Sequence, residues 1–225
     1  MILHRIIPLL ILFTSLPLNA QVALGVNTGI TRMKFSGDPP DGIGYFAPRA
    51  GFSSALRFDY RLNDAFALSI QPAYSLLRSK YSVLNDSATK VVDSTYFSVP
   101  SLSLPVSAIV WSENGRFYVL AGFEITYVLN FTGETLISPL QLTENIYDVD
   151  KFYVYAHFGA GFIIPLGKPY LSFEVRYSQG LKDLNVALVH QGSYLPRTKL
   201  TCFNVLVGLN VPLGNPDIYK LRKHR

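Results

Sequence analysis

The sequence has few charged residues, one cysteine and one tryptophan. Charged side chains make up 16% of the chain, whereas ordinary soluble domains carry roughly 25%, so a fully solvated surface is not indicated. The lone Cys202 excludes an internal disulfide and any paired-cysteine metal site, and it is most simply a structural residue. After the first 20 residues no window offers about 20 continuous apolar residues, which excludes membrane-spanning helices.

The positive charge of the chain is confined to its ends. The formal net charge is +5, but Arg5 and the four basic residues within 220–225 account for most of it. Over residues 21–213 there remain 15 basic against 14 acidic side chains. No basic face is left to neutralise a phosphate backbone, so the sequence excludes nucleic acid as a partner.

The first 20 residues have the pattern of a secretory signal peptide. A positive segment, Met1–Arg5, precedes the apolar run Ile6–Leu18, and the small residue Ala20 stands before Gln21. This order of charge, apolar core and small residue predicts cleavage after Ala20. The sequence therefore predicts an exported protein whose mature chain begins at Gln21.

The segment Lys151–Gly180 shows the clearest structural pattern in the chain. Every second residue from Phe152 to Ile164 is apolar, and the residues between them are mostly small or polar. A second arm alternates in the same way after a Pro/Gly turn at Pro165–Pro169. Side chains of a strand point to opposite faces with a period of two. Arms of this length, with one apolar and one polar face, are typical of strands that cross a membrane in a closed barrel.

The same alternation recurs along the chain and predicts eight strands. Besides the hairpin, which supplies the sixth and seventh, the expected strands span about Val22–Lys34, Pro48–Arg61, Ala65–Tyr81, Thr95–Trp111, 117–130 and Thr198–Leu213. In the fourth, the apolar set changes phase next to Pro100, which predicts a bulge there. Long polar loops are expected at Ser36–Gly44, Val83–Asp93, Thr132–Asp150 and Gln179–Arg197, and short turns at Leu62–Asp64, Ser112–Gly115 and Pro165–Pro169.

Long and short connections alternate, which fixes the predicted architecture. We expect an all-β fold: an eight-stranded antiparallel up-and-down transmembrane β-barrel with short periplasmic turns and long outer loops, located in the outer membrane. The predicted division of the chain is a signal peptide over 1–20, the barrel over 21–213 and a basic periplasmic tail over 214–225. Aromatic residues near both strand ends predict two girdles at the membrane interfaces. They are Phe58, Tyr60, Phe66, Trp111, Phe117 and Tyr170 beside the short turns, and Tyr74, Tyr81, Tyr96, Phe131, Phe152, Tyr177 and Tyr194 toward the long loops.

The polar faces of the strands carry charged side chains that are costly in hydrocarbon, so they should face the lumen and pair. The expected lumen network comprises Arg49, Arg57, Asp59, Gln71, Glu124, His157, Glu174 and Arg176. The interior of an eight-stranded barrel is just wide enough for side chains to fill it. We therefore expect a plugged lumen; the alternative, a small-solute channel lined by these charges, requires a wider barrel.

Motifs for catalysis, cofactors or metals are scarce. No HExxH, paired-cysteine or Gly-rich phosphate motif is present, so no catalytic, cofactor or metal residues are predicted. The pair Gly159 and Gly161 lies inside a strand and is better explained by close packing over an aromatic ring. His190 and Ser193 share the last long loop with Asp183, as an outer-leaflet lipid enzyme would require, but their spacing supports no specific site.

Two further groups of charged residues, one in the loops and one in the C-terminal tail, are most simply explained as charges exposed to solvent. Pairs of aspartates in the loops, Asp38 with Asp41 and Asp148 with Asp150, could bind Ca²⁺. The basic residues of the C-terminal tail could hold the periplasmic end near anionic lipid or a periplasmic partner. Chain termini fray readily, so a disordered tail is the simpler expectation.

The chain resembles the PorT-like small outer-membrane β-barrel proteins, described as an outer membrane protein beta-barrel domain. The resemblance rests on GVNTGIT, FSVPSLSLPV, AHFGAGFIIPLG, LSFEVRYSQGLKDL and the closing VLVGLNVPLG, which together span residues 21–213. It implies outer-membrane lipid and the barrel-assembly machinery as partners. A named member of the family is implicated in a protein-secretion and gliding apparatus, so envelope or secretion-complex proteins are further possible partners. One departure is the extension of about a dozen residues beyond the last strand, where such barrels usually end on an aromatic strand.

The sequence thus predicts a non-enzymatic integral outer-membrane protein with an envelope-structural or surface-interaction role. The alternatives are an accessory subunit of a protein-export apparatus and a porin-like channel.

Overall fold

The computed structural model describes residues 21–36, 44–84, 91–137, 140–145, 150–183 and 199–213. The predicted signal peptide and basic tail lie outside these residues. The described strands are β1 (Gln21–Ser36), β2 (Tyr45–Arg61), β3 (Phe66–Ile70), β4 (Ala73–Leu84), β5 (Val91–Trp111), β6 (Phe117–Val128), β7 (Thr132–Ile137), β8 (Leu140–Asn145), β9 (Phe152–Pro165), β10 (Tyr170–Gly180) and β11 (Lys199–Pro212). No helix in the described part of the chain is long and apolar enough to cross a membrane.

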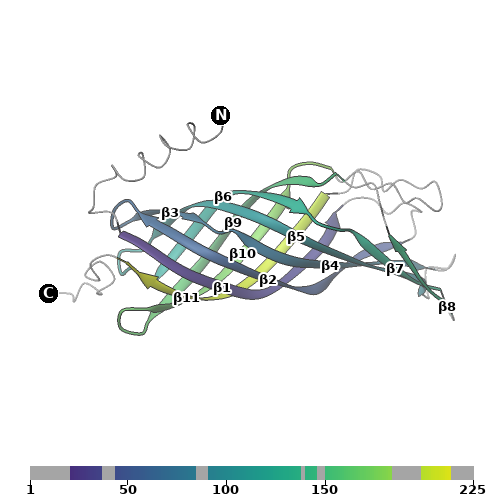
Figure 1. The fold of residues 1–225 in the computed structure, drawn as a ribbon, viewed down its shortest axis with the longest axis horizontal. Helices are drawn as coiled ribbons and strands as arrows, with labels where there is room; N and C mark the ends of the chain where they lie inside the picture. The colour runs from purple at the N-terminus through teal and green to yellow at the C-terminus, as the bar shows by residue number, and fades with distance from the viewer. Residues whose placement is uncertain are drawn as a thin grey trace, which may run out of the picture.

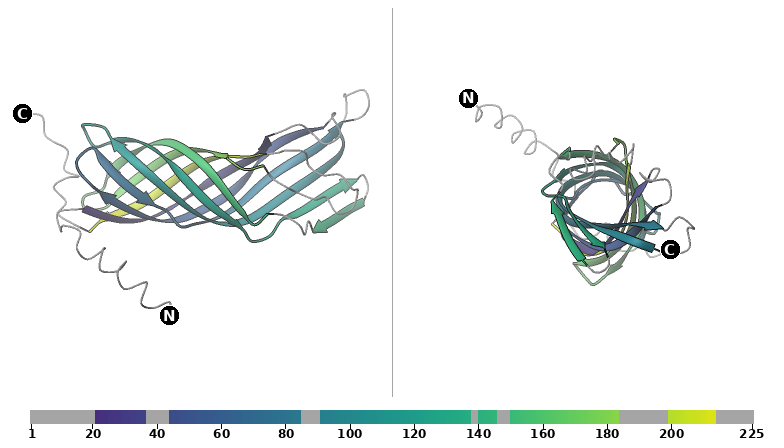
Figure 2. Two further views of the ribbon diagram at one scale, coloured as in Figure 1. Left: turned by 90° about the horizontal axis from the view of Figure 1, so that it is seen from above. Right: turned by 90° about the vertical axis from the view of Figure 1, so that its right-hand side faces the viewer.

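The strands form one antiparallel sheet that closes on itself (Figures 1 and 2). β1 pairs with β2 on one side and with β11 on the other, so the first and last strands seal the ring. β3 and β4 act as a single strand interrupted at Pro72, because both pair with β2 and with β5. The Leu56 amide donates to the carbonyl oxygen of Pro72 at 3.0 Å, which carries the ladder across the interruption.

Around the ring the order is β1, β2, β3/β4, β5, β6, β9, β10 and β11. The predicted eight-stranded antiparallel barrel is confirmed. Short turns at 62–65, 112–116 and 166–169 lie at one end, together with the start of β1 and the end of β11. The longer connections lie at the other end. Short turns mark the periplasmic side of such barrels, so the long connections face outward.

Two expectations about the outer end are wrong. The segment expected as one long loop at Thr132–Asp150 contains the hairpin β7–β8, which pairs with the outer part of β5 and extends the sheet beyond the barrel (Figure 1). The bulge expected next to Pro100 is absent from the described strand, because β5 pairs with β4 in unbroken register from Ala73–Ser103 to Val83–Asp93. Phe97 and Val99 consequently point inward and are buried.

A bulge does occur in β2. The register moves from Arg49 opposite Arg78 to Phe52 opposite Leu76, so three steps on β2 match two on β4. An extra residue exchanges the two faces of a strand. Before the bulge the even-numbered Phe46 points into the barrel, and after it the odd-numbered Ser53 and Arg57 point inward.

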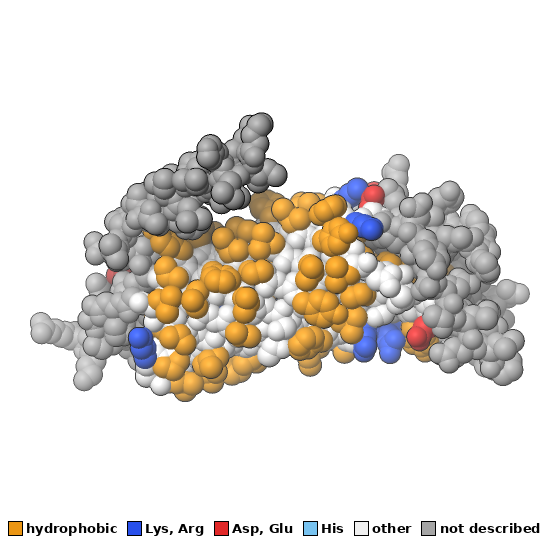
Figure 3. All heavy atoms as spheres, viewed as in Figure 1, with side chains coloured by type: hydrophobic (Ala, Val, Ile, Leu, Met, Phe, Trp, Pro, Cys, Tyr) orange, Lys and Arg blue, Asp and Glu red, His pale blue; other side chains and the backbone are white. Residues whose placement is uncertain are grey.

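The outward faces of the barrel strands carry an apolar belt (Figure 3). Along β11 and just beyond it, every second residue from Phe203 to Leu213 points outward, and each of these residues is apolar and exposed. Their ten residue steps of about 3.3 Å, at a tilt of about 40°, give an apolar height of about 25 Å, which matches the lipid-facing band of outer-membrane barrels. Exposure of such a belt to water would be strongly unfavourable.

The predicted aromatic girdles are correct only in part. Phe58, Phe66, Phe117 and Phe152 lie on the exposed outer surface. Four other residues assigned to the girdles point into the lumen and are buried: Tyr81, Trp111, Phe131 and Tyr170. Tyr194 lies outside the described residues. The inward rings belong to the packing of the barrel interior.

Candidate functional site

The lumen is filled in three layers, which follow one another along the strands. On β5 the inward side chains run from apolar through a mostly hydroxyl stretch to apolar: Phe97, Val99, Ser101, Ser103, Pro105, Ser107, Ile109 and Trp111. β9 repeats this order from Tyr153 and Tyr155 through His157 to Ile163. The barrel therefore has an outer apolar cluster, a polar middle and an inner apolar cluster at the short-turn end.

A charged network centres on Glu174 of β10. Its Oε2 accepts hydrogen bonds from Arg57 Nη1 at 3.1 Å and from the Tyr118 hydroxyl at 3.0 Å. Its Oε1 accepts from Arg176, whose Nε lies at 3.0 Å. Arg57 Nε also donates to Asp59 Oδ2 at 2.8 Å. Each of these charges is buried, and a buried charge is tolerated only when it is paired and hydrogen-bonded.

The network joins opposite walls of the barrel. Arg57 lies on β2 and Glu174 on β10, and these strands are separated by β1 and β11. Arg176 Nη2 donates to Gln71 Oε1 at 2.8 Å, and Gln71 follows β3. Gln71 in turn donates to Ser69 at 3.1 Å. These contacts cross the space that a channel would need.

The charges that face the lumen are balanced among the described residues. Three arginines (Arg57, Arg61 and Arg176) face three carboxyl side chains (Asp59, Glu124 and Glu174). Arg61 lies at the periplasmic end, where its guanidinium is 5.1 Å from the centre of the Trp111 ring. A balanced set gives the lumen no fixed preference for ions of one sign.

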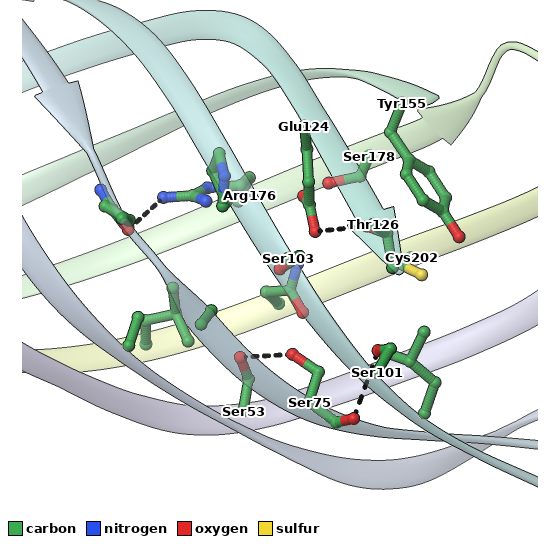
Figure 4. A pocket seen from close by; sticks show the side chains of 17 residues that line it. Ser53, Ser75, Ser101, Ser103, Glu124, Thr126, Tyr155, Arg176, Ser178 and Cys202 are labelled. Carbon is green, nitrogen blue, oxygen red and sulfur yellow. Dashed lines mark hydrogen bonds between the residues drawn. The ribbon is translucent and has the colours of Figure 1, made fainter. Parts of the chain in front are cut away.

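A small cavity lies in the polar middle (Figure 4). Its volume is about 30 Å³, and its lining includes Glu124, Ser103, Ser178 and Arg176. Thr126 Oγ1 donates to Glu124 Oε1 at 3.4 Å. A water molecule needs roughly 10–15 Å³ by this measure, so the cavity has room for about two.

The outer apolar cluster lies inside the barrel, on the side of the long connections. Its buried members are Met33, Phe35, Phe46, Leu77, Tyr81, Phe97, Val99, Val128, Phe131, Tyr153, Tyr155, Leu200 and Cys202. Phe35 is fully buried at its centre, with ring centroids 5.2 Å from Phe97 and 5.4 Å from Phe46. Aromatic contacts of this kind add to the stabilisation from burial. The members of the cluster come from every strand of the ring except β10.

The inner apolar cluster lies inside the barrel at the periplasmic end. It consists of Ala23, Ala67, Ile109, Trp111, Tyr118, Leu120, Ile163 and Tyr170. The Tyr118 ring packs over Gly161, where an added Cβ would fall on the ring atoms. The predicted packing of this glycine under an aromatic ring is confirmed, and it places the Tyr118 hydroxyl next to Glu174.

The structure brings most of the predicted lumen residues together, with one correction. Arg57, Asp59, Gln71, Glu174 and Arg176 form the connected network described above, and Glu124 borders the cavity beside it.

Two predicted residues lie elsewhere. His157 is inside but pairs with Ser107, at 2.8 Å between Nε2 and Oγ. Arg49 is wrongly assigned to the lumen: it is exposed on the outer surface, because the bulge in β2 exchanges the faces at this point.

Several interior residues escaped the sequence reasoning. Met33 and Phe35 continue the inward face of β1 that begins with Ala23 and Asn27, so extending the period-two pattern would have found them. Tyr118 alternates with apolar outward residues and has the parity of Glu124, which is a sufficient signal for an inward hydroxyl.

Metal and loop sites receive no support from the described residues. No group of three or more His, Cys, Asp or Glu among them could hold a metal ion. Asp150 pairs with Lys182 at 2.6 Å on the surface. His190, Ser193, Asp38, Asp41 and Asp148 lie outside the described residues.

A closed eight-stranded barrel with an apolar exterior and a polar, charged interior layer defines an integral protein of the outer membrane, and the protein is located there. The chain belongs to the outer membrane protein beta-barrel domain family, whose model matches residues 15–185. No curated protein matches the chain significantly.

Solved structures of outer-membrane proteins resemble the chain at low identity. The Ail protein of Yersinia pestis is 12% identical with a TM-score of 0.43, over 84% of this chain and 99% of that chain. Neisserial surface protein A is 13% identical with a TM-score of 0.43, over 84% and 97%. OprG from Pseudomonas aeruginosa is 12% identical with a TM-score of 0.44, over 86% and 96%.

Proposed function

We propose that this protein is a closed, non-enzymatic barrel that serves the outer membrane as a structural or surface-interaction protein. The observation that carries the proposal is the layered lumen: an aromatic plug at the outer end, paired charges that join opposite walls, and a second apolar cluster at the periplasmic end. With such an interior, the lumen acts as a hydrophobic core and the outward surface is left to perform the function.

Energetics favour a lumen that stays closed. Passage of an ion would require the Phe35 ring to leave its neighbours and the Arg57–Glu174 pair to separate. Separation of one partner from a buried, hydrogen-bonded pair costs about 3–5 kcal/mol, and displacement of a buried aromatic ring costs a similar amount. An apolar constriction also excludes ions by dewetting.

The interior geometry also supports a non-enzymatic role. Ser107 and His157 form a hydroxyl–imidazole pair of the kind that nucleophilic enzymes use. Both side chains are buried inside the barrel, and neither lines the cavity of about 30 Å³, which is itself too small for a lipid or peptide. The pair therefore serves to satisfy two buried polar groups.

Planar-bilayer recording tests the proposal. We expect the purified, folded wild-type protein to give no stable single-channel current, because both ends of the lumen are closed. The double variant Phe35→Ala/Phe97→Ala removes two rings of the plug and should raise the frequency of brief openings. Phe158→Ala, which removes an outward ring, is the matched control and should remain silent. Stable, reproducible conductance from wild-type protein would overturn the closed-lumen proposal in favour of a small-solute channel.

A second candidate function is that of an accessory subunit of a protein-export or surface-assembly complex, as the PorT-like resemblance implies. The β7–β8 hairpin favours it, because the hairpin carries the sheet beyond the barrel and β8 forms the end of the sheet path. An edge strand offers backbone groups to which a partner's strand can pair.

Crosslinking in intact cells, followed by affinity purification, tests the second candidate. A chain that lacks residues 132–145 should lose any specific envelope partner but keep its folded mobility on unheated gels. Recovery of the barrel-assembly machinery alone, unchanged by the deletion, would reject the export role and retain only the partner that any such barrel needs for insertion.

A further inference from the structure

Six basic side chains form a cationic face on the outer wall of the barrel, just beyond the apolar belt. They lie on the four neighbouring strands β11, β1, β2 and β4: Lys199, Arg32, Lys34, Arg49, Arg78 and Lys80. Figure 3 shows basic side chains, with acidic ones beside them, where the belt ends toward the long connections. All six are exposed or half-buried, so they are available to a ligand.

The register places these cations close to one another. Arg49 pairs directly with Arg78 across β2 and β4, and Met33, which lies between Arg32 and Lys34, pairs with Arg49. Like charges directly opposite in a sheet are destabilising. Among the described residues of β1, β2, β4 and β11, no acidic side chain lies on the outward face to offset this repulsion. The arrangement is therefore suited to an external anion.

Part of the cationic face is a built cavity of about 240 Å³. Arg49 and Arg78 line it, together with Tyr96, Phe97, Ser98, Thr132 and Glu134. The cavity has two positive charges and one negative charge, and its Ser98 hydroxyl is a further hydrogen-bond donor, whereas the Thr132 hydroxyl already donates to the Ser98 carbonyl oxygen at 3.2 Å. Arginine binds phosphate with two parallel hydrogen bonds, so this set of donors matches a phosphate group better than it matches a single carboxylate.

Tyr96 holds two of the cations in place. The Arg49 guanidinium lies 4.6 Å and the Lys80 amine 5.5 Å from the centre of its ring. Such cation–π contacts fix side chains that would otherwise move freely in solvent. Pre-ordering of the side chains lowers the entropy that binding must overcome.

The depth of the cationic face identifies the source of the phosphate. The apolar belt ends at Ile30, Phe52, Leu76 and Phe203 on these four strands. On β1 and β4 the first cation follows two residues later, about 7 Å along the strand. That step leads from the hydrocarbon into the headgroup layer of the outer leaflet. A lipid headgroup is therefore already present at the level of the cavity.

We propose that the cationic face binds the phosphate groups of the phosphorylated glycolipid of the outer leaflet, with Arg49 and Arg78 as the central ligands. The inference rests on the outer-membrane location and is independent of whether the lumen conducts. Binding would fix the rotational position of the barrel in the outer leaflet and gather lipid on one side of it.

The test uses the full folded chain in phosphatidylcholine nanodiscs that contain a small fraction of diphosphoryl lipid A, with bound lipid counted by native mass spectrometry. Lipid A should be enriched around wild-type protein. Arg49→Gln/Arg78→Gln should weaken this enrichment about thirtyfold. Each basic residue near an anionic lipid surface contributes about 1 kcal/mol, and the loss of about 2 kcal/mol corresponds to a factor of about thirty. Arg116→Gln/Lys168→Gln, which removes two exposed cations at the opposite end, is the matched control and should bind like wild type.

Two further measurements with the same nanodiscs distinguish a lipid headgroup from free phosphate as the ligand. Dephosphorylated glycolipid should show no enrichment, and millimolar inorganic phosphate alone should not replace lipid A. Equal binding by the Arg49/Arg78 variant and wild type would overturn the proposal, as would enrichment that persists without lipid phosphates. If free phosphate saturates the cavity and leaves no preference for lipid A, the lipid assignment is wrong. Heat-modifiable mobility on gels verifies that each variant is folded.

Discussion

Replacement of Glu174 by glutamine should destabilise the folded barrel by about 3–5 kcal/mol, the usual cost of removing one partner from a buried ion pair. Each carboxylate oxygen serves two donors: Oε2 accepts from Arg57 and Tyr118, and Oε1 accepts from two nitrogens of Arg176. Glutamine keeps the shape but replaces one of these oxygens by an NH₂ group, which faces donors and accepts nothing. It also leaves an excess of buried positive charge.

The assay is urea unfolding of the protein in phosphatidylcholine vesicles, followed by the fluorescence of Trp111, the single tryptophan. Trp111 is a sensitive reporter because its ring centroid lies 4.8 Å from that of Tyr118, a member of the network. Asp150→Asn makes the same chemical change in the exposed pair with Lys182, and should cost less than about 1 kcal/mol. A Glu174→Gln midpoint as close to wild type as that of Asp150→Asn would refute the cross-lumen network as a stabilising element.

Three further substitutions probe the plug, the inner cluster and the lipid-facing belt. Phe35→Ala should cost about 3–5 kcal/mol in the same urea assay, since the fully buried ring leaves a cavity; a loss below about 1 kcal/mol would contradict the packed plug. Gly161→Ala should cost about 1–3 kcal/mol, because the new methyl group displaces the Tyr118 ring, and unchanged stability would show that the ring has room to move. Phe158→Arg, near the middle of β9, should cost about 2–4 kcal/mol in bilayers, whereas Phe152→Arg at the end of the strand should cost about 0–1 kcal/mol; equal costs would contradict the predicted membrane depth.

The architecture was predictable because alternation along the strands is enforced by the membrane. On β9 the sequence pattern from Phe152 to Ile164 assigns every outward residue correctly, and on β10 it places Glu174 and Arg176 inside. Lipid admits only apolar side chains, so a polar side chain at mid-strand identifies the inner face. The same argument predicts most of the lumen network from the sequence.

The rule fails where the interior is apolar as well. At the outer end of β5, Phe97 and Val99 belong to the apolar set whose change of phase predicts a bulge next to Pro100 if every apolar residue faces lipid. The strand is regular, and these side chains pack around Phe35. An apolar residue fits both lipid and plug, so composition alone does not distinguish the two faces at this level. The misassigned aromatics Trp111 and Phe131 have the same cause.

The bulge in β2 and the β7–β8 hairpin depend on pairing rather than on local sequence. The extra residue between Arg49 and Phe52 is defined only relative to β4, and it moves Arg49 from the lumen to the cationic face. The hairpin forms because β5 continues beyond the barrel and offers β7 an edge. Partners that lie far apart in the chain determine both features, and one strand read alone contains no signal for them.

The native Cys202 offers the most direct test of the closed lumen, because it is the only cysteine, is 5% exposed and belongs to the outer apolar cluster. Wild-type protein folded in vesicles is treated with a charged, membrane-impermeant maleimide, and the reaction is followed by mass spectrometry. A closed lumen predicts that the thiol stays unmodified in the folded protein and reacts completely once the protein is unfolded in urea. Modification of the folded protein at the rate seen in urea would show that water and solutes enter the barrel from outside, and would contradict the account.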